Sequence, residues 1–151
     1  MKLVRNSKPQ TLDGYVDPRQ PNIPIPDMPV IVGDMPDDEL MELFNTFVSW
    51  ADFLSVEAVK ANLVEEEYED KMLELKSEHI ALGDSLYRDR ASAEISDGMH
   101  ELRLRLRTFK NVRKLLEAKF GNCDRNAKAL SRELTRRTTI AEGDRGRRYG
   151  P

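Results

Sequence analysis

The sequence predicts an all-α protein built around one long, antiparallel, coiled-coil-like helical hairpin with an extended proline-rich N-terminal arm. Apolar residues recur at alternating spacings of four and three along two long stretches, the pattern of helices that pack along a single seam. Seven of the eight prolines lie in residues 1–36, ahead of the first stretch. The expected boundaries are an arm over 1–35, a hairpin over 36–138 with helices at about 36–82 and 91–137, and a flexible Arg/Gly tail over 139–151.

The arm is expected to be extended, because proline fixes φ and has no amide hydrogen to donate to a helix or a central strand. Its stretch from Pro21 to Val32 is typical of polyproline-like structure. Aliphatic residues are unusual in a passive linker, and two alternatives stay open: a disordered arm, or an arm that packs on its own helices or on a neighbouring subunit. The candidate contact residues are Ile23, Ile25, Val30 and Ile31.

The first helix is expected to begin near Pro36, which suits a first turn, with Asp34 as its N-cap. Its seam comprises Leu40, Phe44, Phe47, Ala51, Leu54, Ala58, Ala61, Tyr68, Met72, Leu75 and Leu82. Only Glu65 and His79 interrupt it. Four aromatic residues make the first turns wider and more apolar than the rest, which predicts a contact with a partner or second subunit through Phe44, Phe47, Trp50 and Phe53.

The second helix is expected after a turn around Gly83 and Asp84. Its seam comprises Ile95, Met99, Leu102, Leu106, Phe109, Leu116, Phe120, Cys123, Ala127, Leu130 and Leu134, with Arg113 at one seam position. Glycine in a helix interior costs about 1 kcal/mol, but the seam keeps its phase across Gly121, so we expect the helix to continue there. The residues from Thr138 onward are glycine-rich and are expected to fray.

Charge predicts how the two helices pair. Residues 37–87 hold 14 acidic and 3 basic residues, whereas residues 88–137 hold 14 basic and 7 acidic residues. This asymmetry and the short connection favour antiparallel pairing. The acidic block at 65–70 should then face residues 103–110, and the acids at the start of the first helix should face Arg132, Arg136 and Arg137. A two-helix hairpin buries only one seam, so we expect a homo-oligomer.

Several functional classes are not expected. No run approaches 18 apolar residues, which argues against a membrane span, and the polar start argues against a signal peptide. The single cysteine, Cys123, excludes an internal disulfide and fits a buried seam position. We find no glycine-rich phosphate loop, nucleophile elbow or paired metal motif. His79 and His100 alone are too few for a metal site. We therefore expect no enzyme, cofactor, metal site or small-molecule substrate.

The remaining positive signal is basic. Arginines at the end of the second helix and in the tail are candidates for a nucleic-acid contact: Arg132, Arg136, Arg137, Arg145, Arg147 and Arg148. The alternative is that the acidic first helix neutralises the basic stretch. The net charge of −3 offers no attraction to nucleic acid from the molecule as a whole.

Two segments carry a resemblance to a known family, Phe47-Val48-Ser49-Trp50-Ala51 and the stretch from Leu130 to Arg137. The layout resembles small helical proteins of tailed bacteriophages, in particular the recombination mediators, which form ring oligomers, bind single-stranded DNA and load a recombinase. The resemblance implies Arg132, Arg136 and Arg137 as DNA contacts. The polar start and the lack of a membrane span favour the host cytoplasm as the location, with the virion as the alternative. The proline-rich arm and negative charge depart from that type. A virion, scaffold or connector component is an equal alternative, and a small regulator of a host protein is a third.

Overall fold

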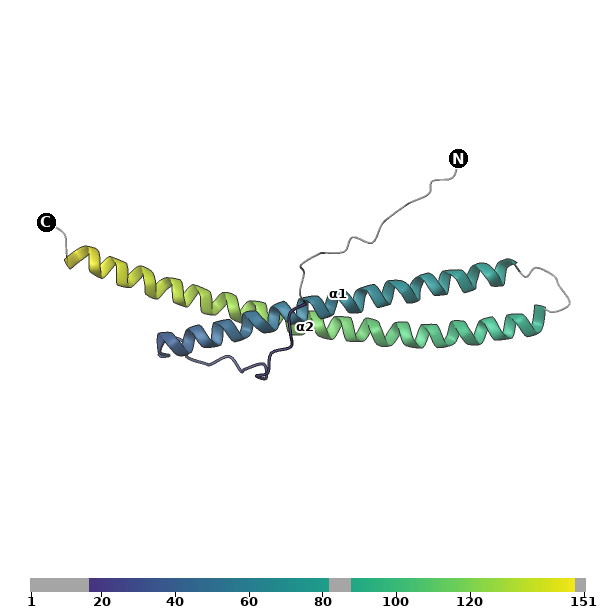
Figure 1. The fold of residues 1–151 in the computed structure, drawn as a ribbon, viewed down its shortest axis with the longest axis horizontal. Coiled ribbons are helices and arrows are strands. Elements are labelled where there is room, and N and C mark those ends of the chain that lie inside the picture. Colours follow the sequence, from purple (N-terminus) through teal and green to yellow (C-terminus); the bar gives the residue numbers. More distant parts are fainter. Residues whose placement is uncertain (1–16, 82–87, 149–151) are drawn as a thin grey trace, which may run out of the picture.

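The structure is a helical hairpin of two long helices, α1 (Asp37–Ala81) and α2 (Arg88–Arg148), which pack along each other (Figure 1). This computed structural model describes residues 17–81 and 88–148, and side chains over 17–81 and 93–144. No strand occurs in these ranges. The predicted all-α hairpin is therefore confirmed. The predicted turn at Gly83 and Asp84 and the seam residue Leu82 lie outside the described residues.

The N-cap of α1 lies two residues later than predicted. The Leu40 amide donates to the Pro36 carbonyl at 3.0 Å, so Pro36 occupies the N-cap position that was assigned to Asp34. Asp34 lies instead in the preceding turn, which the Met35 amide closes by donating to the Val32 carbonyl at 3.3 Å. Proline has no side chain that could cap the helix. Instead, three acidic residues in the first turn of α1 stabilise its N-terminus by interacting with the positive end of the helix dipole.

The second helix is continuous through Gly121, as predicted, but it is longer than expected at both ends. The tail that was expected to fray from Thr138 onward is helical as far as Arg148. Glycine costs a helix about 1 kcal/mol per residue, which weakens a helix without ending it. The final turns of α2 project past the start of α1 (Figure 1), and residues 138–144 are exposed.

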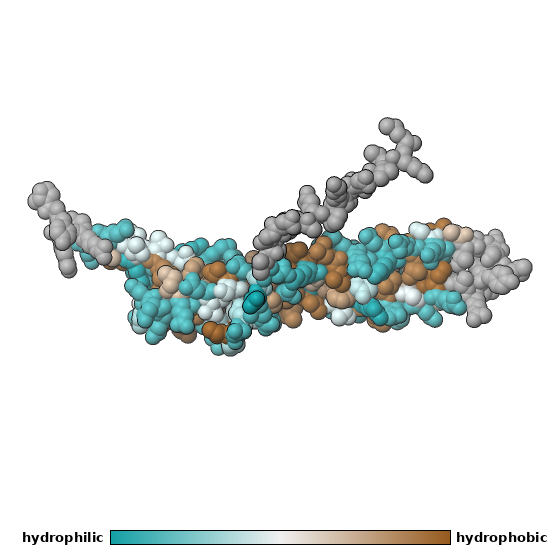
Figure 2. Space-filling view, in the orientation of Figure 1, coloured by the Kyte–Doolittle hydropathy of each residue, from teal (hydrophilic) through white to brown (hydrophobic). Residues whose placement is uncertain are grey.

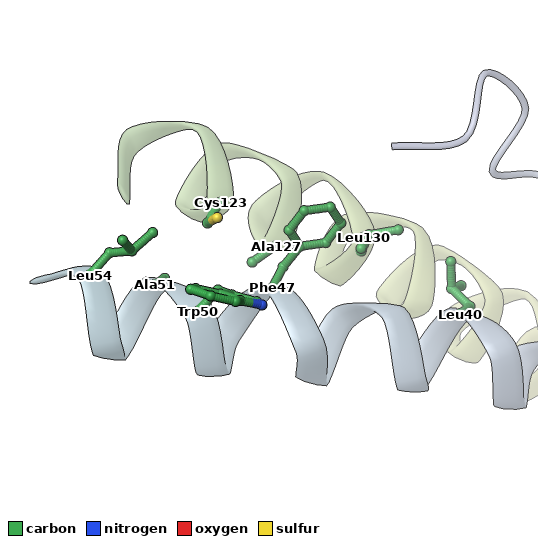
Figure 3. Close-up of a cluster of buried hydrophobic side chains, with 8 residues drawn as sticks. All are labelled: Leu40, Phe47, Trp50, Ala51, Leu54, Cys123, Ala127 and Leu130. Carbon is green, nitrogen blue, oxygen red and sulfur yellow. The ribbon is translucent and has the colours of Figure 1, made fainter. Parts of the chain in front are cut away.

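The main core lies at the open end of the hairpin, away from the connection between the helices. Figure 3 shows its buried side chains converging from the two helices, Leu40, Phe47, Trp50, Ala51 and Leu54 from α1 and Cys123, Ala127 and Leu130 from α2. Toward the connection, the buried described residues are Leu106 and Glu65. The core is therefore thick at one end of the hairpin and thin at the other.

Candidate interaction surfaces

The arm packs on its own hairpin over the part that the structure describes. The Trp50 indole Nε1 donates to the Ile23 carbonyl at 2.9 Å. Farther along α1, Lys60 Nζ lies 2.7 Å from the Asp17 carboxylate. Three arm side chains, Met28, Val32 and Met35, pack against the main core. Of the open alternatives, residues 17–36 therefore adopt the one in which the arm lies on its own helices (Figure 1).

Arg137 of α2 fastens the arm to both helices. Its guanidinium donates to three arm carbonyls, those of Val32 at 3.1 Å, Gly33 at 3.0 Å and Met35 at 2.7 Å. The same side chain donates to the Asp37 carboxylate at 2.6 Å and to Glu133 at 2.9 Å. Only 19% of the Arg137 side chain is exposed. Arg137, one of the residues that were predicted to contact DNA, therefore binds the arm instead.

The neighbouring arginines are more open. Arg136 makes a two-pronged pair with Glu133, at 2.8 and 2.7 Å, and remains exposed. Hydrogen bonds from Arg136 and, with a smaller effect, from Arg137 stabilise the charged form of the Glu133 carboxyl and lower its pKa to about 2. Arg132 is exposed to solvent. The side chains of the other three predicted contacts, Arg145, Arg147 and Arg148, lie outside the described residues, although the backbone there is helical.

The aromatic end of α1 is largely used within the chain. Phe47 is fully buried and Trp50 is 8% exposed. The Trp50 and Phe53 rings meet edge to face with centroids 5.9 Å apart, and Phe44 and Phe53 pack against the core as half-buried residues. The arm and α2 together cover this surface. In contrast, the four arm residues that were predicted as contacts are exposed: Ile23, Ile25, Val30 and Ile31.

The two charged seam positions meet each other across the hairpin. Arg113 Nε donates to the Glu65 carboxylate at 2.9 Å, and Lys110 Nζ lies 3.6 Å from it. Both cations lower the pKa of the Glu65 carboxyl, and the hydrogen bond from Arg113 has the larger effect. Arg113 also donates to Glu117 at 2.7 Å. Among the described residues, no buried side-chain nitrogen or oxygen lacks a partner. The pair is therefore a satisfied polar layer within an apolar seam.

The register of the helices differs by about one turn from the expected one near this layer. Glu69 pairs with Lys110 at 2.9 Å, and the Tyr68 ring stacks on Phe109 with centroids 5.3 Å apart. Lys110 faces the acidic block as expected, because it pairs with Glu69 and lies 3.6 Å from Glu65, but the closest partner of Glu65 is Arg113. At the open end the expected pairing is confirmed for Arg137 and Asp37. The sequence did contain an indication of this pair, because Glu65 and Arg113 each interrupt an apolar seam in the same half of the hairpin.

The described part of the chain also contains a groove, two histidines and a cysteine. A groove of about 710 Å³ runs between the arm at residues 21–23 and the exposed side of α1, and its lining includes Asp38, Glu42 and Ser49. No group of three or more His, Cys, Asp and Glu in the described ranges could hold a metal ion. His79 and His100 are exposed. Burial raises the pKa of the Cys123 thiol, which keeps it protonated and unreactive.

Exposed aliphatic side chains are distributed over both helices. Figure 2 shows apolar patches on one face of the molecule, among a mostly hydrophilic surface. The exposed large hydrophobic residues of the two helices are Met41, Val59, Leu63, Leu73 and Ile80 on α1 and Leu104, Val112, Leu115 and Ile140 on α2.

Comparisons of the chain with protein-family models, with curated proteins and with solved structures gave no match. No described helix is long and apolar enough to cross a membrane. The surfaces and charges above are therefore what points to a function.

Proposed function

We propose that this chain is a non-enzymatic assembly protein that forms a homo-oligomer through the exposed faces of its hairpin. One observation carries the proposal. Among the described residues, nine hydrophobic residues are buried, whereas thirteen large hydrophobic side chains are exposed. A pair of helices can cover one stripe of each helix and leaves the other faces to water or to another molecule. The excess of exposed aliphatic residues favours another molecule.

The uneven core supports the same proposal. The half of the hairpin near the connection buries Leu106 and Glu65 only, among its described residues, while Leu63, Leu73 and Ile80 are exposed there. Fully burying one aliphatic side chain contributes about 1.5–3 kcal/mol. Association of two hairpins along this half would therefore stabilise the part of each chain that has the thinnest core.

The arm contributes a second contact surface. Arg137 and Trp50 hold it against the hairpin, which orders the backbone before any partner arrives. Its Val30 and Ile31 side chains point into solvent, with exposures of 101% and 62%. A pre-ordered segment that presents aliphatic side chains loses less entropy on binding than a disordered one. The phage-type layout fits a component of a virion, scaffold or connector.

Multi-angle light scattering over a series of concentrations tests the proposal. The monomer has a mass of 17.4 kDa. An oligomer that persists at low micromolar concentration is expected. A mass that stays at the monomer value up to the highest soluble concentration would contradict the proposal.

A second candidate function is binding of single-stranded DNA, in line with the resemblance to recombination mediators. It is supported by exposed basic residues along α2: Arg103, Arg107, Lys114, Arg125 and Arg132. Acidic partners within the chain already engage Lys110, Arg113 and Arg137, which reduces the charge available to phosphates. Fluorescence anisotropy of a labelled oligonucleotide at low and moderate salt distinguishes this function, because phosphate binding weakens steeply with salt. Arg132→Ala would then weaken binding.

A further inference from the structure

A second apolar stripe runs along α1 on the side away from α2. Its members recur at spacings of four and three, as in a seam, yet all are exposed: Val59, Leu63, Glu66, Asp70, Leu73, Ser77 and Ile80. We call this set the α1 outer stripe. A helix face that is meant for solvent has no need of seam spacing. Its two carboxylates give the stripe a negative centre.

The outward side of α2 carries a matching stripe. Its members also recur at spacings of four and three and are all exposed: Leu104, Thr108, Asn111, Leu115, Ala118 and Asn122. We call this set the α2 outer stripe. None of its members is charged, although charged residues make up 34% of the chain. Two exposed bases, Arg107 and Lys114, border it. Neither base makes an ion pair with the described residues. An uncharged stripe with a basic border is suited to packing against an apolar stripe that carries acids.

The two outer stripes lie level with each other over the part of the hairpin between Val59 and Leu73. Three contacts between the helices fix the register: Glu65 with Arg113, Tyr68 with Phe109, and Glu69 with Lys110. Since both helices rise about 1.5 Å per residue, this register places Leu63 level with Leu115 and Leu73 level with Leu104. It also places Asp70 level with Arg107. The aliphatic pairs and the opposite charges therefore coincide without any axial shift.

Charge decides which stripes can meet. Two α1 outer stripes in contact would bring the carboxylates of Glu66 and Asp70 together, and two α2 outer stripes would bring their basic borders together. Juxtaposed like charges disfavour an interface, whereas opposite charges select a partner and fix its alignment. The α1 outer stripe is thus complementary to the α2 outer stripe, and the two lie on opposite sides of one molecule.

We propose that the α1 outer stripe of one copy docks against the α2 outer stripe of a second copy, side by side and without axial shift. This inference rests on the homo-oligomer proposed above and names its interface. The docked helices run antiparallel, as α1 and α2 do within one chain. Every copy keeps one stripe for a further neighbour, so the contact is head-to-tail and produces a ring if it closes or an open array if it does not.

Two variants that each lose one stripe test the interface. In the first, Leu63→Ser and Leu73→Ser disrupt the α1 outer stripe. In the second, Leu104→Ser and Leu115→Ser disrupt the α2 outer stripe. Each variant alone should be a monomer with the circular dichroism of a helical protein. Mixed in equal amounts, they should form a dimer, because each supplies the stripe that the other lacks.

The outcomes of this experiment are separate from those of the proposed function. A wild-type oligomer whose mass neither variant changes would overturn the stripe interface and leave the assembly function intact. A wild-type monomer would overturn both. Variants that are monomeric alone and also when mixed would contradict a head-to-tail contact.

A charge exchange between Asp70 and Arg107 provides an independent test. These residues lie on opposite sides of the hairpin, so they can meet only between copies. Asp70→Lys or Arg107→Glu alone should weaken self-association about tenfold or more, and the double variant should restore it. Glu78→Lys, at an exposed position outside both stripes, is the matched control. Failure of the double variant to recover would overturn the pairing. An Arg107→Glu variant that loses only salt-sensitive oligonucleotide binding would assign the basic border to DNA and would also overturn it.

Discussion

At the scale of single residues, the pair of Glu65 and Arg113 does more for specificity than for stability. Buried ion pairs gain little net free energy, because desolvation offsets most of the attraction between the charges. However, a slip of one helix by a turn would separate these two charges and leave each without its main partner in the seam. The pair therefore fixes the register, and the register places the two outer stripes level with each other.

Removing one member of this pair should destabilise the hairpin more than removing both. Arg113→Leu leaves the Glu65 carboxylate in the seam and should lower the thermal midpoint by roughly 5–10 °C. The double variant Glu65→Leu/Arg113→Leu should return to the wild-type midpoint or exceed it. Lys128→Leu, which breaks an exposed pair with Asp124 within α2, is the control and should change the midpoint little. Thermal unfolding followed by circular dichroism measures all three. A double variant less stable than Arg113→Leu would contradict the interpretation.

Seam residues could be predicted from the sequence because a single period determines them. Described positions such as Leu54 and Leu130 are buried where the spacing of four and three placed them. The pairing of Glu65 with Arg113 could not be predicted to the residue. It depends on where the helices begin after the connection, and α2 starts at Arg88, earlier than composition suggested.

At the scale of elements, the arm and the hairpin form one unit. The sequence indicated that aromatic residues are concentrated at the start of α1 and that the arm contains aliphatic residues. It did not indicate that the arm would cover the aromatic residues. Trp50 connects them through its hydrogen bond to Ile23. The prolines indicate that the arm is extended, but they do not indicate which side chain its backbone carbonyls bond to. The role of Arg137 therefore could not be predicted.

Loss of the Arg137 guanidinium should release the arm. Arg137→Ala removes the donors to three arm carbonyls, so the turn in which the Met35 amide donates to the Val32 carbonyl should open more often. Hydrogen-exchange protection of the Met35 amide should fall about tenfold, while α1 stays protected. Arg136→Ala is the matched control, since Arg136 pairs with Glu133 and bonds to no described arm residue. Equal exchange in the two variants would show that Arg137 does not hold the arm.

Acid should release the arm through Glu133. The folded pKa of this carboxyl is lowered to about 2 by Arg136 and Arg137, whereas an unperturbed Glu has a pKa near 4.3. A lowered folded pKa adds stability above the unfolded pKa, and that contribution is lost as pH falls from about 4 to about 2. Trp50, the single tryptophan, reports the change, because its emission should shift to longer wavelength as the arm leaves. Glu133→Gln should show part of this shift already at neutral pH. An emission maximum that is unchanged down to about pH 2 would contradict the prediction.

At the scale of the whole molecule, the hairpin has two charged sides, an acidic one on α1 and a basic one on α2. The opposite net charges of the two stretches predicted the pairing within one chain. The same asymmetry also acts on the outward faces, where seam-like spacing recurs a second time. The most apolar spacing in each helix indicates one seam, and the stripes can be distinguished from it only by the exposure of their apolar residues.

Sedimentation velocity of the full chain, alone and with a labelled single-stranded oligonucleotide, tests most directly whether the exposed faces serve assembly. We predict that the chain alone sediments as an oligomer and that the oligonucleotide sediments separately at moderate salt. A chain that sediments as a monomer alone and forms a larger species only with the oligonucleotide would contradict the assembly function and favour DNA binding.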